Sequence, residues 1–303
     1  KVSMTDIVPI SEHAYNMGGS QIWLEPGEQF TLDELIKAIC VCSANDAAVA
    51  VAEFVGGSEE AFAEMMNQKA AELGMTHTHF VNACGLDAEG HYSSARDVAR
   101  MSAELLHHPK ILEYSQIWMD SLRGGETQIV NTNKLLKTYP GTTGLKTGTT
   151  SKAGVCIAAT AQRDGMNLLA VVLGSDSGKE RFESAATLLD YGFANYALVD
   201  VYPDAPLAPV DVLLGTVEQV QPQLNRDCRL LVRKGEESQV TTQLTVAQDV
   251  EAPVDQGQTL GQMEVYVGGE LRDTIPIVSA QQVDRLTVPG IFGQLLRQLL
   301  MAR

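Results

Sequence analysis

The sequence predicts an α+β domain, followed by a small β-rich domain and a C-terminal amphipathic helix. Three observations predict this order. Apolar residues recur at helical spacing over 31–108, they alternate at strand spacing over 154–174, and a Pro-rich break at 202–209 precedes short Val, Leu and Thr runs separated by turn residues. The domain boundaries that we expect are 1–199, 200–283 and 284–303.

Four helices are expected between residues 31 and 108. The first begins at a capping box formed by Thr31 and Glu34. Ser and Gly mark the other ends, because Ser accepts a backbone N–H at a helix start and Gly adopts the left-handed conformation at a helix end. The expected starts are Thr31, Ser43, Ser58 and Ser94, and the expected stops are Gly56-Gly57, Gly74 and Pro109.

A strand hairpin and a further helix complete the first domain. Residues alternate in character from Val155 to Ala159, a turn follows at 163–165, and 168–173 is an apolar run, so the pattern predicts an antiparallel pair. The next helix is expected over about 179–196. Beyond the Pro-rich break, the β-like runs are 212–214, 230–232, 241–246 and 263–267.

The C-terminal segment has two apolar series at helical spacing. Ile291, Leu295 and Leu299 recur at i+4, as do Phe292, Leu296 and Leu300. We interpret this segment as an anchor that lies on a membrane surface, and a helix docked on its own domain is the alternative. No run of 18 apolar residues occurs in the sequence, so no membrane-spanning helix is expected.

The composition is that of an ordinary globular protein, and it narrows the classes of partner. Of the 303 residues, 45% are apolar and 20% are charged, so the chain has enough apolar material to fold. Lys and Arg total 22 against 38 Asp and Glu, which gives a formal net charge of −16. Because neutralising phosphates requires surplus cations, nucleic acid is not expected as a partner.

The five cysteines match no metal-binding or redox spacing. Cys40, Cys42 and Cys156 lie in apolar runs, and we expect them to be buried and to act as small apolar side chains. No metal and no cofactor is therefore expected.

Two short motifs could carry chemistry. Lys146-Thr147-Gly148 precedes the predicted hairpin and places an ammonium and a hydroxyl side by side, with a glycine that lets a ligand approach the strand closely. That combination suits a carboxylate ligand. Ser43-Ala44-Asn45 lies between two expected helices. Taken alone, Ser43 is more simply a helix N-cap and Asn45 a residue of the first turn.

In this order, the two motifs resemble the second and third motifs of the penicillin-interacting serine enzymes, Ser-x-Asn and Lys-Thr-Gly. Further segments resemble the low-molecular-mass penicillin-binding proteins, the D-alanyl-D-alanine carboxypeptidases, and the resemblance covers essentially the whole chain. It implies a penicillin-binding/β-lactamase-like transpeptidase domain. The matching segments are Thr78-x-Phe80-x-Asn82-x-x-Gly85-Leu86-Asp87, Ser93-Ser94-Ala95-Arg96-Asp97, Lys146–Thr150 with Ala153-Gly154, and Gly178-Lys179-Glu180-Arg181.

The sequence departs from the family at the nucleophile. No serine precedes a lysine by three positions, and Thr149-x-x-Lys152 overlaps the Lys-Thr-Gly region. The family carries Ser-x-x-Lys upstream of Ser-x-Asn. We therefore expect the 1–199 domain to be N-terminally incomplete and the nucleophile to lie before Lys1. On this expectation the 303 residues alone are inactive, and a partner segment covers the surface left by the missing strands.

The resemblance implies hydrolysis of the terminal D-Ala–D-Ala bond of peptidoglycan stem peptides through an acyl-serine intermediate. Ser43 would relay a proton to the departing amine. Asn45 would hydrogen-bond the substrate amide, and Lys146 would set a positive field over the site. β-Lactam antibiotics are the expected inhibitors. The substrate places the protein outside the cytoplasm, on the outer face of a bacterial cytoplasmic membrane.

The resemblance also implies how the substrate is held. Thr147 and Arg181 would bind its terminal carboxylate, Arg181 through the two parallel donors of its guanidinium. The backbone N–H of Thr149 would donate to the oxyanion. Gly148 would leave room for the peptide along the strand.

Several alternatives stay open at this point. A D-Ala-D-Ala endopeptidase shares the motifs, and so does a non-catalytic peptidoglycan-binding or scaffolding homologue. A β-lactamase is disfavoured because the chain has an extra β-rich domain and lacks Glu-x-x-Leu-Asn. A metallopeptidase built on His77, His79 and His91 is disfavoured because His-Glu-x-x-His is absent from the sequence.

Overall fold

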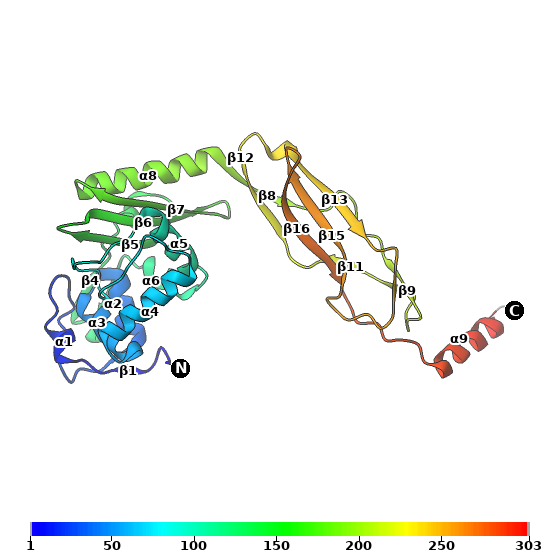
Figure 1. The fold of residues 1–303 in the computed structure, drawn as a ribbon, viewed down its shortest axis with the longest axis horizontal. Helices are drawn as coiled ribbons and strands as arrows, with labels where there is room; N and C mark the ends of the chain where they lie inside the picture. Colours follow the sequence, from blue (N-terminus) through cyan, green and yellow to red (C-terminus); the bar gives the residue numbers. More distant parts are fainter. Residues whose placement is uncertain (1, 302–303) are drawn as a thin grey trace. The chain divides into compact units, whose positions relative to one another are not determined.

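The computed structural model describes residues 2–301, apart from the side chains of 294–299 and 301. It divides into two compact units, the first ending at Phe193 and the second beginning at Ala194. Helices and strands are labelled as in Figure 1.

The first unit begins with a short strand pair and a group of helices. β1 (Ile7–Val8) and β2 (Phe30–Thr31) are antiparallel, and α1 (Glu12–Tyr15) lies between them in the sequence. The Thr31–Glu34 capping box is confirmed, with the Thr31 hydroxyl accepting from the Glu34 N–H and the Glu34 carboxylate accepting from the Thr31 N–H. The helices that follow are α2 (Leu32–Cys42), α3 (Asn45–Gly56), α4 (Glu59–Glu72), α5 (Ala95–Leu105), α6 (Lys110–Ser115) and α7 (Leu135–Thr138).

An apolar core joins α2 and α3 to the strands around them. Leu35, Val41 and Val49 are fully buried there, because the helical period places them on the inner faces of their helices. The hairpin of β3 (Met119–Leu122) and β4 (Thr127–Val130) contributes Leu122 and Ile129 to the same core. This core fixes the junction between α2 and α3, where the Ser-x-Asn motif lies.

A three-stranded antiparallel sheet occupies the middle of the first unit, in the order β5-β6-β7. Helix α8 (Gly178–Asn195) covers one face of the sheet, and α5 and α6 lie on the other side (Figure 1). Ala185 and Leu189 of α8 pack on Ile157 and Ala159 of the sheet. The strands are β5 (Thr142–Thr150), β6 (Gly154–Arg163) and β7 (Met166–Ser175), so the predicted hairpin is confirmed and β5 adds the Lys-Thr-Gly strand to it.

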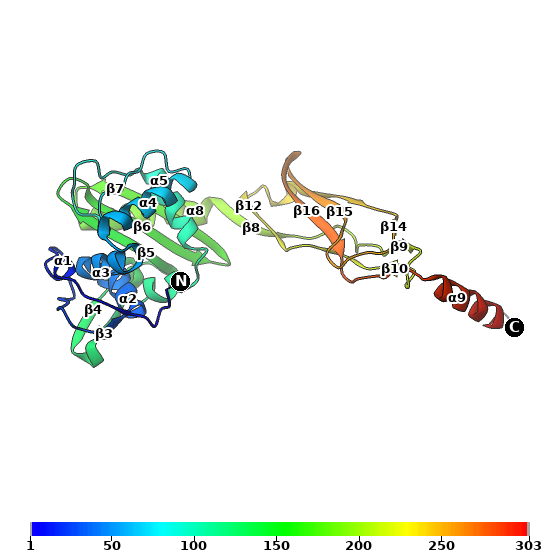
Figure 2. The ribbon, with the colours of Figure 1, turned by 60° about the horizontal axis from the view of Figure 1, so that its bottom comes forward.

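The second unit is β-rich. Its four-stranded sheet has the order β11-β16-β15-β13, and β15 and β16 lie side by side as its long central pair (Figure 2). Met263 of β15 and Ile275 of β16 lie opposite each other in this pair, and both are fully buried. The strands are β8 (Tyr196–Val201), β9 (Val210–Leu213), β10 (Gln219–Val220), β11 (Pro222–Leu224), β12 (Cys228–Arg233), β13 (Val240–Val246), β14 (Asp249–Glu251), β15 (Thr259–Val267) and β16 (Glu270–Ser279).

The last described element is α9 (Val288–Met301). Phe292 and Leu300 are exposed, whereas Leu295, Leu296 and Leu299 of the predicted apolar series fall among the side chains outside the description. Within residues 2–301, no helix combines the length and the apolar character needed to cross a bilayer.

Two expectations about individual residues are wrong. Cys40, Cys42 and Cys156 are partly rather than fully buried: Cys40 and Cys156 line a cavity, and Cys42 is the last residue of α2 and packs against the edge of the first apolar core. Pro109 does not merely end a helix: α5 stops at Leu105, and Pro109 is the residue that precedes α6, where its fixed φ suits a helix start.

Candidate active site

Ser43 lies at the junction between α2 and α3. It ends α2 in the left-handed conformation, with φ 63° and ψ 38°, and Ala44 is the residue that precedes α3. Its interpretation as an N-cap is therefore wrong. The Ser43 hydroxyl does not cap α3. It accepts a hydrogen bond of 2.8 Å from Nζ of Lys146, which lies 103 positions later in the sequence.

Lys146 lies on β5 opposite Ala158 of β6. Its ammonium donates both to Ser43 Oγ and to the carbonyl of Thr147, each at 2.8 Å. The pKa of Lys146 is lowered from 10.5 to about 8, mainly by burial, and the nearby charge of Arg181 acts in the same direction. The thiols of Cys40 and Cys42 lie close enough to act in the opposite direction. The amine is thus mostly charged at neutral pH and can lose its proton in mild alkali.

Asn45 is the first residue of α3 and is almost fully buried. Its Nδ2 donates to the Gly18 carbonyl at 2.8 Å, and its backbone N–H donates to the Ser20 carbonyl at 2.8 Å. Gly19 lies so close that a Cβ there would stand 2.6 Å from Asn45 Nδ2. The segment before β2 therefore fixes the rotamer of the Asn45 amide beside Ser43.

Thr147 and Thr149, which follow Lys146 on β5, have different partners. Thr147 Oγ1 lies 2.6 Å from Thr132 Oγ1 and is buried. Thr149 Oγ1 lies 3.4 Å from Arg181 Nη1. Of the two side chains, the described contacts link Thr149 rather than Thr147 to the arginine.

Arg181 reaches from α8 to the end of the Lys-Thr-Gly strand. Its Nη1 donates to the carbonyls of Gly148 at 3.2 Å and Cys156 at 3.1 Å. Burial lowers the pKa of Arg181, and its Nε is a buried donor without a partner among the described atoms. A buried guanidinium with an unused donor favours an anionic ligand, since an unpaired buried N–H is costly.

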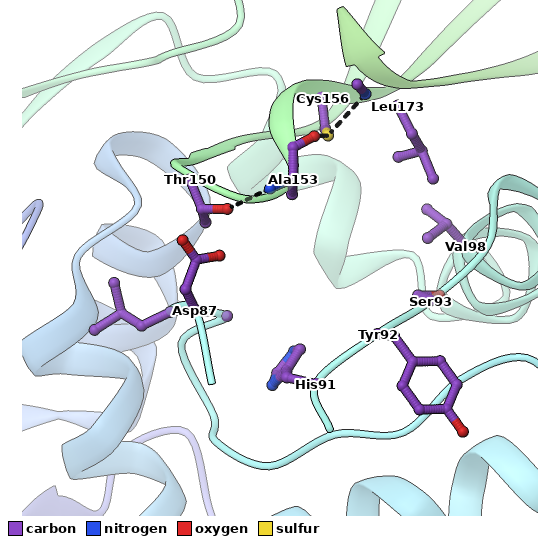
Figure 3. A pocket seen from close by; sticks show the side chains of 12 residues that line it. Asp87, His91, Tyr92, Ser93, Val98, Thr150, Ala153, Cys156 and Leu173 are labelled. Carbon is purple, nitrogen blue, oxygen red and sulfur yellow. Dashed lines mark hydrogen bonds between the residues drawn. The ribbon is translucent and has the colours of Figure 1, made fainter. Parts of the chain in front are cut away.

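Two neighbouring cavities lie along this strand. One, of about 590 Å³, is mainly apolar and includes Ile39, Met101, Leu105 and Lys146 in its lining. The other, of about 400 Å³, is the pocket in Figure 3, where Asp87 and Thr150 lie at one side and His91 and Tyr92 at the other. Asp87 accepts from the Lys152 N–H at 3.1 Å, so the loop that carries it is tied to the end of β5.

Three contributors were not anticipated from the sequence: Thr132, Asn133 and Asp87. Asn133 Nδ2 donates to the Gly144 carbonyl at 2.9 Å and so positions the start of the Lys-Thr-Gly strand. Asp87 belongs to one of the segments that carry the family resemblance, and this membership is the sequence feature that could have pointed to it. The sequence around Thr132 gives no sign of this role, because only the fold brings Thr132 next to its partner Thr147.

Of the three histidines considered for a metal site, His77 has its Nδ1 3.1 Å from the Thr76 hydroxyl, and the other two contact the backbone. His79 Nδ1 donates to the Gly90 carbonyl at 2.9 Å, and His91 Nδ1 accepts from the Val81 N–H at 3.2 Å. Across the described part of the chain, no three His, Cys, Asp or Glu residues form a group that could hold a metal ion.

Comparisons with known proteins show which family the chain resembles. Residues 1–177 match the family model of D-alanyl-D-alanine carboxypeptidase, and residues 199–285 match that of the penicillin-binding protein 5 C-terminal domain. The chain is 40% identical to D-alanyl-D-alanine carboxypeptidase DacF of Bacillus subtilis over 94% of its own length and 75% of that protein's. It is 31% identical to DacC of Escherichia coli over 97% of its own length and 75% of that protein's.

Solved structures are similar as well. A penicillin-binding protein of Streptococcus pneumoniae, described as a peptidoglycan synthesis regulatory factor (PBP3), superposes with a TM-score of 0.75 at 27% identity, covering 93% of this chain and 86% of that one. With one model spanning more than half of the residues and relatives above 30% identity along nearly the whole length, the chain belongs to the D-alanyl-D-alanine carboxypeptidase family.

Proposed function

We propose that the protein removes the terminal D-alanine from peptidoglycan stem peptides as a serine-type carboxypeptidase. The observation that carries this proposal is the 2.8 Å hydrogen bond from Lys146 to Ser43, which joins the Ser-x-Asn and Lys-Thr-Gly motifs in one site. In this arrangement Ser43 can pass a proton to the departing amine, and the Lys146 ammonium keeps the Ser43 hydroxyl oriented. The Asn45 amide then faces the substrate's peptide bond.

The carboxylate of the substrate would bind at the other end of the strand. Arg181 supplies a buried positive charge there, with Thr149 beside it at 3.4 Å. Gly148 is exposed and nothing stands within 4 Å of a Cβ at this position, so a peptide can lie along the strand. The Thr149 N–H would be one oxyanion donor. Thr147 would contribute its hydroxyl to carboxylate binding, and Thr132 holds that hydroxyl in place.

The nucleophile would come from a Ser-x-x-Lys segment that packs into the apolar cavity of about 590 Å³ beside Lys146. No such motif occurs in the 303 residues. Serine attack on the peptide carbonyl would release D-alanine and leave an acyl-serine, which water then hydrolyses. A segment with an apolar face would cover Ile39 and Met101 and bring its serine next to Ser43. The described chain alone would form no acyl intermediate.

The remaining parts of the proposal concern location. The substrate lies outside the cytoplasm, and the protein would act there, at the membrane's outer face. We divide the chain into a carboxypeptidase domain at 1–199, a β-rich domain at 200–283 and an anchor at 284–303. The exposed Phe292 and Leu300 of the terminal helix support a membrane-surface role.

Covalent labelling with a fluorescent penicillin tests the proposal. The 303-residue chain should give no labelled band, whereas a chain extended before Lys1 by a Ser-x-x-Lys segment should be labelled. Labelling of the short chain would contradict the placement of the nucleophile. An extended chain that folds, judged by its melting curve, and yet takes no label would contradict the carboxypeptidase assignment.

A further inference from the structure

Trp23 is an exposed aromatic residue between two buried apolar ones. Ile22 and Leu24 are 1% and 0% exposed, and Trp23 between them is 72% exposed. The backbone at Trp23 is left-handed rather than extended, and its indole faces solvent while Ile22 and Leu24 fill the core. A large exposed aromatic ring adds little to folding, and it is the pocket lined by this ring that indicates a ligand.

The backbone around Trp23 is clamped from two sides. The carboxylate of Asp46 accepts from the Ile22 N–H and, at 3.1 Å, from the Leu24 N–H. Arg123 donates to the Ile22 carbonyl at 2.9 Å and to the Trp23 carbonyl at 3.0 Å. These contacts hold Trp23 at φ 52°, a conformation that favours glycine. The fold therefore sustains a strained residue in order to present its side chain.

Trp23 lines a pocket of about 380 Å³ together with Tyr15, Asn16, Gln21 and Glu25. The lining combines an aromatic plane with amide, hydroxyl and carboxylate groups. This is the chemistry that suits a pyranose ring, because the C–H groups of one sugar face pack on an indole while the equatorial hydroxyls form hydrogen bonds at the edge. An extended peptide would instead need backbone partners from a strand edge, and residues 15–25 contain none of the described strands.

The pocket is close to the active site along the chain. Ser20 bonds to the Asn45 N–H, and Trp23 follows three residues later, so the covalent distance is at most about 10 Å at roughly 3.4 Å per residue. A stem peptide of a few residues is tethered to amino sugars at the end opposite its D-alanines. In the proposed arrangement its sugars lie near Trp23 while its C-terminus is at Arg181.

We propose that Trp23 and its pocket form a saccharide subsite that binds the glycan part of the cell-wall substrate. The identification of the sugar as the substrate's own glycan rests on the proposed carboxypeptidase function, whereas the binding itself depends only on the pocket. Asp46 and Arg123 act as positioning residues, because they hold the backbone and do not line the pocket.

The test is a titration of the 303-residue chain with the β-1,4-linked tetramer of N-acetylglucosamine, followed by tryptophan fluorescence. The chain has two tryptophans, so a Trp118→Phe background leaves Trp23 as the sole reporter. We expect a saturable blue shift or quench with a dissociation constant in the millimolar range or below. Trp23→Gly, read by calorimetry, should weaken binding at least tenfold, and Trp23→Phe should stay within about threefold of the original.

Melting temperatures separate a binding role from a structural one. Trp23→Gly removes the strained φ, so its melting temperature should be unchanged or about 1–3 °C higher. Tyr202→Ala is the matched control, because Tyr202 is also 72% exposed and should not affect binding. Absence of saturable binding, equal binding by Trp23→Gly, or a loss of more than about 5 °C in that variant would each overturn the proposal.

The penicillin label distinguishes this proposal from the proposed function. A chain extended by a Ser-x-x-Lys segment that binds the tetramer but takes no label would refute the carboxypeptidase function and leave the saccharide subsite standing. Labelling without tetramer binding would refute the subsite alone. Trp23-dependent binding to lipid vesicles without binding to the tetramer would also overturn it.

Discussion

Replacing Lys146 by methionine should change how the stability of the first unit depends on pH. In the folded protein, burial lowers the pKa of Lys146 from 10.5 to about 8. Between these two values the unfolded chain holds a proton that the folded chain has released, so the free energy of unfolding rises with pH. Met cannot titrate, and it has a similar length and an apolar stem that suits the cavity.

The size of the effect follows from those two pKa values. At pH 7 the lysine is protonated in both states and contributes no pH dependence. By pH 10 it is mostly neutral in the folded state and mostly charged in the unfolded state, which corresponds to a gain of about 2–3 kcal/mol. The original protein should therefore gain about that much relative to Lys146→Met between pH 7 and pH 10. This is equivalent to about 5–10 °C in melting temperature for a unit of this size.

Urea unfolding at several pH values measures this difference. Trp23 and Trp118 both belong to the first unit, so tryptophan fluorescence reports on that unit alone. Burial raises the pKa values of Cys40 and Cys42 to about 11, which lowers stability above pH 9, but both thiols are present in the two proteins and largely cancel. A difference that stays flat from pH 7 to pH 10 would refute the burial of the Lys146 ammonium.

Three further predictions follow from single contacts. Asp46→Ala should cost about 2–4 kcal/mol in urea unfolding, because the N–H groups of Ile22 and Leu24 lose their buried acceptor; Asp46→Asn should recover part of the loss, and a cost below 0.5 kcal/mol would contradict the clamp. Gly19→Ala should lower the melting temperature by several degrees, since φ is 85° and the Cβ would collide with a buried amide. Arg181→Gln in the extended chain should raise the KM for an acyl-D-Ala-D-Ala peptide about 10–100-fold, and a KM unchanged within twofold would exclude the arginine from carboxylate binding.

The local features of the fold follow from the sequence because they depend on neighbouring residues. The capping box at Thr31 and the hairpin of β6 and β7 need only nearby partners, and both are confirmed. The N-cap interpretation of Ser43 is wrong for a reason that local pattern cannot reveal. Its hydroxyl meets a lysine from a strand 103 residues later, and that contact takes the place of a cap.

The site shows the same division between local and distant determinants. Motif resemblance selected Ser43, Asn45 and Lys146, and the structure brings Ser43 and Lys146 into contact. The partnership of Thr147 with Thr132 depends on how β5 meets the preceding turn. Likewise, the clamp around Trp23 involves residues about 20 and 100 positions away, which no periodicity could indicate.

A double-mutant cycle on Ser43 and Lys146 tests the central claim most directly. In the extended chain, the acylation rate with a fluorescent penicillin should fall about 10²–10⁴-fold for Ser43→Ala and for Lys146→Met. Because the two side chains are in contact at 2.8 Å, the double variant should lose little more than the more damaging single change. If the two losses multiply in the double variant, the hydroxyl and the ammonium act independently and the shared site is contradicted.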